Sequence, residues 1–337
     1  MQHELSKGRL LDQNGNLAEA GFACSLVKDY DRNDIKAGKS RIKEWDYYYI
    51  GDDKHGIALT IDDNSYMNLA SVTIFDFLKK EYIQTSTMHF LTFGKTGLPS
   101  SSNYGDVRFK DRKAELVFAN DGTIRHLTGS FKKLQGKRLT FDITLTPTTE
   151  KTMVIATPFN KKGHFYYNQK RNNLKAQGYY QYGEEKTSLD QAYGVLDWGR
   201  GVWTYQNTWY WSSLNACQDG HTIGFNLGYG FGDTSAASEN MFFFDDRAYK
   251  LNDVEFLIPK NGRKDDFLKP WRIVSKSGDI NLTFTPVLNR KGGGNLLFIK
   301  SLQNQVYGYF DGEIKTEEGT YSLYHLLGFA EKVFNRW

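Results

Sequence analysis

The sequence predicts a nearly all-β protein with few short helices, made of two antiparallel β-barrels in tandem. Aromatic residues make up 15% of the chain, glycine is frequent at 32 residues and proline is scarce at 6. Aromatic side chains favour strands, and glycine favours the tight turns that join them. The length of 337 residues exceeds one typical core and therefore predicts two domains.

Strand-like segments follow one another along the chain. Residues 57–61, 114–118 and 139–145 are apolar or alternate in polarity over strand lengths. Asp-Gly dipeptides such as those at 121–122 and 219–220 are typical of hairpin turns. A turn about every ten residues is the pattern of a sandwich or a barrel.

An internal sequence repeat supports duplication. The segment that begins at Trp45 leads to Gly56, and the segment that begins at Trp209 leads to Gly220. In both copies the glycine follows the tryptophan by eleven positions and precedes an apolar segment. The copies lie 164 positions apart, close to half the chain, so the repeat predicts two similar barrels.

The boundary between the barrels is expected near the polar stretch 168–173, which precedes a fresh β pattern. The sequence therefore predicts an N-terminal barrel over residues 1–175 and a C-terminal barrel over residues 176–337.

The pattern of charges and the lack of targeting segments exclude several classes of partner and location. The chain carries 43 basic and 39 acidic residues and has no dense basic run, which argues against nucleic acid. No segment has the length and apolarity of a membrane span, and no apolar stretch follows a basic N-terminus, so we expect a cytoplasmic protein. Cys24 and Cys217 are too few for a disulfide framework. The composition says nothing of the oligomeric state.

Motifs for metals and cofactors are missing. The seven histidines never fall within five positions of one another, and no cysteine pair is close. No phosphate loop or nucleophile elbow occurs. Residues 228–233 alternate glycine with aromatic residues but have Asp233 where a dinucleotide loop needs glycine, so they are interpreted as a strand. We expect neither a cofactor nor a metal.

The most informative segment is rich in tryptophan. Four of the seven tryptophans, together with one carboxylate and one guanidinium, fall between residues 197 and 211: Asp197, Trp198, Arg200, Trp203, Trp209 and Trp211. Burial among large rings would raise the pKa of Asp197 and suit it to proton donation. Arg200 could stack on an aromatic ring or pair with Asp197. Pairing would instead hold the carboxylate ionised, in an aromatic plug with a structural ion pair. The residues leave both alternatives open.

These segments resemble a known family, the one called domain of unknown function 2804. The resemblance rests on residues 195–203, the Trp-Tyr-Trp at 209–211, the glycine–aromatic stretch 228–233 and the terminal segment 328–337. The opening residues 5–12 and the Trp45 hairpin also fit, so it spans essentially the whole chain. The family carries no assigned activity.

A more distant resemblance is to the two-barrel lipocalin-like group that includes carotenoid hydratase and tocopherol cyclase. It rests on Asp197-Trp198 before a Trp-rich strand, and on the closing Gly-Phe-Ala-Glu at 328–331. The resemblance implies that residues 328–337 form a strand, although their apolar pattern alone fits a helix equally well, and it implies a ligand-site role for Glu331. The group usually has a histidine beside the acid, where this chain has Leu196.

Two functions follow from these observations. The first is binding of a small hydrophobic molecule, isoprenoid- or lipid-like, in an aromatic-lined barrel cavity. Its candidate ligand-binding residues are Trp198, Arg200, Trp203, Trp209, Trp211 and Glu331. The second is a cofactor-independent hydratase, cyclase or isomerase in which Asp197 protonates an alkene and the tryptophans stabilise the cation. The sequence does not decide whether the chain is an enzyme.

Overall fold

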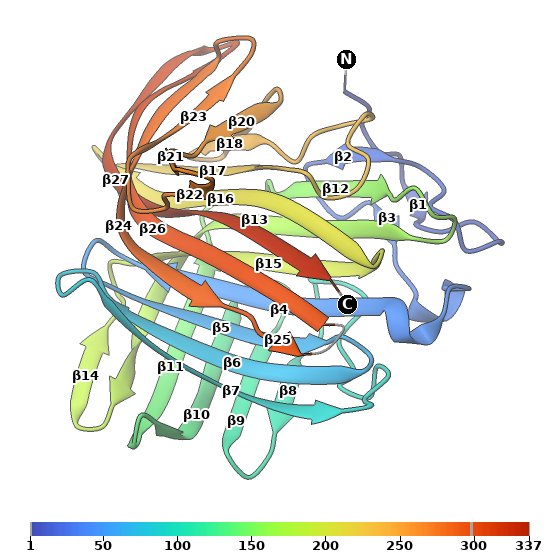
Figure 1. Cartoon of the computed structure of the whole chain (residues 1–337), viewed down its shortest axis with the longest axis horizontal. Helices are drawn as coiled ribbons and strands as arrows, with labels where there is room; N and C mark the ends of the chain where they lie inside the picture. The colour runs from blue at the N-terminus through green and yellow to red at the C-terminus, as the bar shows by residue number, and fades with distance from the viewer. Residues whose placement is uncertain (1, 297–298, 337) are drawn as a thin grey trace.

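The computed structural model describes residues 2–296 and 299–336, and two large curled sheets account for most of them (Figure 1). The helices described are two short 3₁₀ turns, η1 (Arg32–Asp34) and η2 (Lys39–Arg41). Every pairing within the two large sheets is antiparallel. The predicted fold class is confirmed.

The first sheet contains thirteen strands in the order β7-β6-β5-β4-β15-β13-β11-β10-β9-β8, with β12 and β14 paired to β13, and β2 paired to β12. Its strands are β2 (Gly21–Ala23), β4 (Ile42–Gly51), β5 (His55–Asp63), β6 (Met67–Asp76), β7 (Glu81–Phe90), β8 (Val107–Lys110), β9 (Ala114–Asn120), β10 (Arg125–Leu134), β11 (Lys137–Pro147), β12 (Met153–Pro158), β13 (Phe165–Tyr182), β14 (Glu185–Ser188) and β15 (Tyr193–Val202).

The second sheet contains ten strands in the order β19-β18-β17-β16-β27-β26-β24-β23-β20, with β25 paired to β26. Its strands are β16 (Gln206–Gln218), β17 (His221–Tyr229), β18 (Met241–Phe244), β19 (Arg247–Lys250), β20 (Val254–Leu257), β23 (Trp271–Ser275), β24 (Ile280–Gly292), β25 (Asn295–Leu296), β26 (Ile299–Thr316) and β27 (Gly319–Arg336). Two small sheets complete the fold: β1 (Gly8–Arg9) with β3 (Lys28–Asp29), and the hairpin β21 (Lys260–Asn261) with β22 (Lys264–Asp265).

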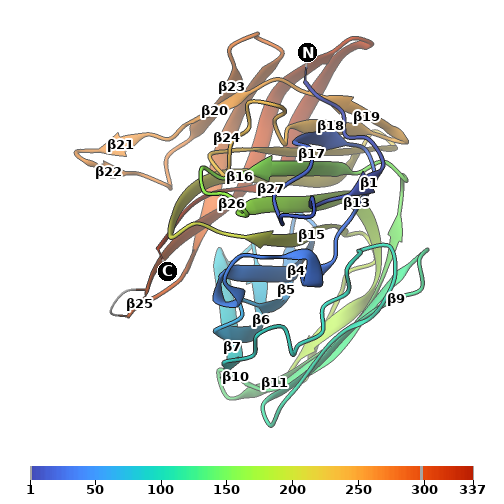
Figure 2. The same cartoon turned by 90° about the vertical axis from the view of Figure 1, so that its right-hand side faces the viewer.

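The two sheets repeat one topology. Read from one edge, β7-β6-β5-β4-β15-β13-β11-β10-β9 matches β19-β18-β17-β16-β27-β26-β24-β23-β20 strand for strand. The Trp45 and Trp209 segments form the equivalent strands β4 and β16, each the first strand of a hairpin. In the described residues the end strands of each sheet do not pair with each other, so the halves are curled half-barrels (Figures 1 and 2). The sequence repeat therefore corresponds to a structural repeat.

The chain passes from the first sheet to the second at residues 203–205, after β15. The expected boundary between residues 175 and 176 lies inside β13, a long strand at the centre of the first sheet. We therefore propose that the division between the halves follows β15. The polar stretch 168–173 that suggested a linker belongs to this buried strand instead.

Each half-barrel has its own hydrophobic core on its inner face. The first core includes Tyr48, Leu196 and Trp198, and the second includes Phe225, Trp271 and Phe310. The terminal segment forms β27, which settles the choice between strand and helix for residues up to Arg336, whereas Trp337 lies outside the described residues.

The sheets pack on each other through the outer faces of their central strands. Because side chains alternate along a strand, Leu196 and Trp198 point into the first half-barrel while Val195 and Asp197 point toward the second sheet. Tyr49 and Phe75 of the first sheet pack on Tyr307 across this interface, with Tyr49–Tyr307 ring centroids 5.0 Å apart.

Two equivalent glycines permit close approach of neighbouring strands. A methyl group on Gly194 would lie 2.8 Å from the Tyr49 carbonyl oxygen, and one on Gly328 would lie 2.7 Å from the Ser213 carbonyl oxygen. We expect Gly194→Ala and Gly328→Ala each to lower the free energy of unfolding by about 1–3 kcal/mol, since backbone must move. Denaturant unfolding measures this, and Gly38→Ala, which meets nothing within 4 Å, is the matched control. Equal stability of all three variants would contradict the prediction.

Candidate functional site

A layer of buried polar side chains lies between the two sheets, where a hydrophobic contact would be the simpler solution. It is assembled from β13, β15, β16, β26 and β27, with one residue from the segment before β18. We call the following residues the inter-sheet cluster: Lys170, Asp197, Trp211, Glu239, Gln305 and Glu331.

Strand register places two of the three acids of the cluster, Asp197 and Glu331, at equivalent positions of the repeat. In the first sheet Asp197 on β15 lies between Tyr47 on β4 and Lys170 on β13. In the second sheet Glu331 on β27 lies between Trp211 on β16 and Gln305 on β26. The acids therefore occupy the same place in each half, and the outer faces of the two sheets bring them together.

Asp197 is a buried, fully partnered carboxylate. Lys170 Nζ lies 2.8 Å from its Oδ2, and Asn168 Nδ2 donates to its Oδ1 at 2.6 Å. The side chains of Lys170 and Asp197 keep 3% and 11% of their surface exposed. The Lys170 ammonium also lies 3.7 Å from the centre of the Trp211 ring. This ammonium balances the charge of Asp197 and covers one face of the Trp211 ring.

Glu331, in contrast to Asp197, is held by two neutral hydrogen-bond donors. Trp209 Nε1 donates to its Oε1 at 2.9 Å, and Gln305 Nε2 donates to its Oε2 at 3.2 Å. Burial raises the pKa of Glu331 to about 7, and the nearby Asp197 charge adds to this, against the lowering effects of the Trp209 hydrogen bond and Lys170. A carboxyl with this pKa is shared between protonated and ionised forms near neutrality, as a general acid requires.

Glu239 adds a third carboxyl. Burial raises its pKa, and Lys170 and a hydrogen bond from Asn226 oppose the rise. Asn226 Oδ1 accepts from Trp211 Nε1 at 2.7 Å, while its Nδ2 donates to the Glu239 carbonyl oxygen at 2.7 Å. Lys170 therefore acts electrostatically on three carboxyls, while Lys250 also acts on Glu239 and Arg290 also acts on Glu331. Burial outweighs these charges and raises the pKa of both glutamates.

The structure brings together four of the residues singled out from the sequence and separates the others. Asp197, Trp209, Trp211 and Glu331 meet in or beside the inter-sheet cluster. Trp198 and Arg200 point the other way, into the first half-barrel. Arg200 pairs with Asp46 at 3.1 Å and stacks on Trp198, so the expected alternative of an Arg200–Asp197 ion pair is wrong. Residues 197 and 200 lie on opposite faces of one strand.

Trp203 belongs to a neighbouring aromatic cluster at the end of the inter-sheet layer. Its ring centroid lies 5.3 Å from that of Trp45, 5.8 Å from Trp209 and 4.8 Å from Phe231. The Trp45 ring lies directly on Gly199, where an added Cβ would come within 1.9 Å of the ring.

Three aromatic side chains in or beside the cluster are partly exposed. These are Trp45, Tyr47 and Trp209, whereas Lys170 and Glu331 are buried. Trp209 connects the inter-sheet cluster with the aromatic cluster around Trp203, because it packs on Trp203 and donates to Glu331.

Sequence reasoning missed Lys170 and Glu239. Lys170 was part of the polar stretch interpreted as a boundary, and its role depends on strand pairing that the sequence does not display. One signal was available: Gly-x-x-acid occurs at 194–197 and again at 328–331. Combined with the Trp45/Trp209 repeat, this pattern would have identified Asp197 and Glu331 as equivalent residues.

Two further observations describe what residues 2–296 and 299–336 lack. They contain no group of three or more histidine, cysteine, aspartate or glutamate side chains placed to hold a metal ion. They also contain no helix with the length and apolarity needed to cross a membrane.

Comparison with known proteins shows which family the chain belongs to. A family model described as Domain of unknown function (DUF2804) matches residues 2–337. The chain belongs to this family. No curated protein matches it in sequence. Among solved structures it is similar to a protein from Nitrosomonas europaea provisionally named AttH, with a TM-score of 0.56 and 13% identity over 92% of this chain and 98% of the other.

Two other solved structures are similar over most of their length. Kievitone hydratase from Nectria haematococca has a TM-score of 0.49 and 14% identity, over 93% of this chain and 96% of the other. CghA has a TM-score of 0.40 and 9% identity, over 98% and 97% of the two chains. The likeness to the Nitrosomonas protein supports the tandem lipocalin-like fold of this DUF2804 chain.

The raised pKa of Glu331 predicts a pH-dependent stability. The folded state holds a proton on Glu331 up to about pH 7, whereas an ordinary glutamate loses it near 4.5. The free energy of unfolding therefore falls as pH rises through this window, by up to about 3 kcal/mol. We expect Glu331→Gln to lack this component, so its stability relative to the wild type rises with pH. Urea unfolding at several pH values measures it. Exposed Glu317→Gln is the control, and parallel curves for wild type and Glu331→Gln would contradict the prediction.

The Lys170–Asp197 pair predicts a coupled double-mutant result. Lys170→Met leaves the Asp197 carboxylate buried without its ammonium and should lower the free energy of unfolding by about 3–5 kcal/mol. Lys170→Met combined with Asp197→Asn removes both charges and should recover most of that loss. Denaturant unfolding of the four proteins in the cycle measures the coupling. Additive effects would show that the pair does not act as a unit.

Proposed function

We propose that this DUF2804 protein is an acid–base enzyme that adds water across, or isomerises, a carbon–carbon double bond of a small unsaturated molecule, and that Glu331 is its proton donor. The observation that carries the proposal is a buried carboxyl with a pKa near 7 held by two fixed donors beside an ion-paired carboxylate. Pairs of carboxyls with different environments are how proteins separate acid and base roles.

Roles follow from the partners of each group. Glu331 delivers its proton to a substrate carbon, and the ionised Asp197 accepts a proton from the attacking water or from the neighbouring carbon of the substrate. Each cycle therefore moves one proton off Glu331 and one onto Asp197, and exchange with solvent restores both. Lys170, Asn168 and Gln305 are positioning residues in this scheme, because they hold the two carboxyls.

The charge of Lys170 bears on the substrate. Its ammonium covers one face of Trp211, so the four tryptophans do not form an open cage for a carbocation as the sequence suggested. A buried positive charge instead favours a transition state that develops negative charge. We therefore expect a double bond conjugated to a carbonyl group, whose oxygen gains charge as the bond reacts.

Binding without reaction remains the alternative function. Both half-barrels are filled by their own side chains on the inner face, including Trp198 in the first and Trp271 in the second. A ligand in a barrel cavity, as expected from the sequence, therefore competes with a packed core. The inter-sheet cluster supports catalysis more directly, because it holds the titratable groups that binding alone does not need.

An isotope experiment tests the proposal without knowledge of the substrate. The purified protein is incubated with a small-molecule extract of its source cells in ¹⁸O-labelled water and, separately, in deuterium oxide. Mass spectrometry should reveal a compound that gains labelled water or carbon-bound deuterium. Glu331→Gln should abolish the product, and the wild-type rate should fall as pH rises above about 7 because the proton donor is lost. Product formation by Glu331→Gln at the wild-type rate would refute the role of Glu331.

A further inference from the structure

Arg290 on β24 extends the inter-sheet cluster by one strand. It lies directly opposite Gln305 on β26, and Gln305 lies opposite Glu331 on β27. Nη1 of Arg290 donates to Gln305 Oε1 at 3.3 Å, and Gln305 Nε2 donates to Glu331 Oε2 at 3.2 Å. A single amide group therefore separates a guanidinium from the proposed proton donor.

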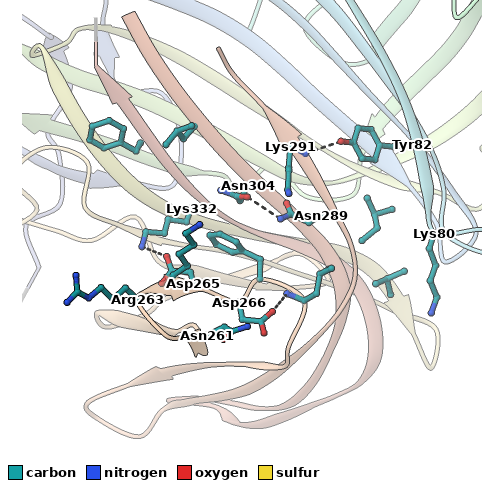
Figure 3. A pocket seen from close by; sticks show the side chains of 17 residues that line it. Lys80, Tyr82, Asn261, Arg263, Asp265, Asp266, Asn289, Lys291, Asn304 and Lys332 are labelled. Carbon is teal, nitrogen blue, oxygen red and sulfur yellow. Dashed lines mark hydrogen bonds and ion pairs between the residues drawn. The ribbon is translucent and has the colours of Figure 1, made fainter. Parts of the chain in front are cut away.

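The side chain of Arg290 points toward the first sheet. Its chain neighbours Asn289 and Lys291 line a groove on the other face of β24 (Figure 3). Nε of Arg290 donates instead to Thr73 Oγ1 and to Gln84 Oε1, both at 3.1 Å. Arg290 therefore belongs to the layer between the sheets.

The charge of Arg290 is not balanced within the part of the chain that the structure describes. The acceptors of its hydrogen bonds are one hydroxyl and two amide oxygens, all neutral, and it forms no ion pair with a described carboxylate. Burial raises the pKa of Glu331 to about 7 despite the opposing charge of Arg290, so this carboxyl keeps its proton for part of the time at neutral pH. The guanidinium therefore has an unpaired charge beside the reacting groups.

A structural role accounts for only part of the guanidinium. The bonds of Nε tie β24 to β6 and β7, and Nη1 holds Gln305, while Nη2 donates to none of the described residues. A neutral amide could supply such ties without an uncompensated charge. Arg290 is partly exposed and Gln84 is exposed, whereas Gln305 and Glu331 are buried. The charge thus lies at the solvent edge of the cluster, where a dissolved anion can reach it.

We propose that the substrate of the inter-sheet cluster is an α,β-unsaturated carboxylate, and that its carboxylate binds Nη2 of Arg290. This inference rests on the function proposed above and narrows its substrate class. Guanidinium groups bind carboxylates through charge-assisted hydrogen bonds. Because the carboxylate and the double bond are adjacent in such a molecule, binding at Arg290 directs the double bond past Gln305 toward Glu331. The same guanidinium stabilises the negative charge that the carboxylate oxygens gain as the bond reacts.

Calorimetric titration with octanoate tests the recognition of the carboxylate. Octanoate has the charged head group and no double bond, so it can bind without reacting. We expect saturable binding of one octanoate per chain, and roughly tenfold weaker binding of octanamide, which has the same chain and no charge. Arg290→Gln should raise the Kd for octanoate about tenfold and leave the Kd for octanamide unchanged. Arg290→Lys keeps the charge without the planar fork and should give an intermediate Kd for octanoate.

Arg272→Gln is the matched control, because Arg272 on β23 is exposed and also donates to an amide oxygen, that of Asn281. It should leave the Kd for octanoate unchanged. The proposal is overturned if octanoate does not bind, if octanamide binds as tightly, or if Arg290→Gln keeps the wild-type Kd. It is also overturned if Arg290→Gln weakens the binding of both molecules equally, as the loss of sheet contacts alone would do.

The outcomes separate this inference from the proposed reaction. A labelled product in the isotope experiment, together with octanoate binding that does not depend on Arg290, would refute the carboxylate site alone. Octanoate binding that depends on Arg290, without any labelled product, would refute the reaction alone.

Discussion

The inter-sheet cluster is organised around one buried ion pair, between Lys170 and Asp197, on the face of the first sheet that packs against the second. Removing both charges from water costs several kcal/mol per ion, and the pair offsets this cost only because its geometry is closed. Asn168 completes the hydrogen bonding of Asp197, and the Trp211 ring receives the Lys170 ammonium from the opposite sheet. Both residues of the pair belong to the first sheet, so the ion pair neutralises Asp197 within that sheet, and the Lys170–Trp211 contact is its link to the second sheet.

Duplication accounts for two of the three acids in the cluster. Equivalent strands place Asp197 and Glu331 at the same position of each half, and packing of outer face on outer face brings the copies together. The halves differ in the residue paired to the acid, which is Lys170 in one and Gln305 in the other. An ammonium holds a charge in place, whereas an amide leaves a buried carboxyl that prefers its proton. A symmetric scaffold therefore presents two chemically different acids.

Side chains alternate along β26 and β27, so consecutive residues lie on opposite faces of the second sheet. Gln305 and Glu331 meet in the inter-sheet cluster, and their chain neighbours Asn304 and Lys332 lie on the other face of these strands. Trp198 and Trp271 belong to the hydrophobic cores on the inner faces of the two sheets.

The sequence by itself determined the fold class, the duplication and the C-terminal strand β27. The alternation of polarity along strands, the turn residues and the Trp45/Trp209 repeat are local patterns. The sequence also selected Asp197, Trp209, Trp211 and Glu331, which do lie together. It placed the half boundary inside β13. Of the two contacts that it left open for Arg200, stacking on a ring is observed and pairing with Asp197 is not, since Arg200 turns inward to Asp46 and Trp198. Only the tertiary structure decided that Lys170 and Glu239 complete the cluster. These neighbours lie on strands far apart in the chain, and their proximity follows from register and from the packing of two sheets, which no local pattern encodes.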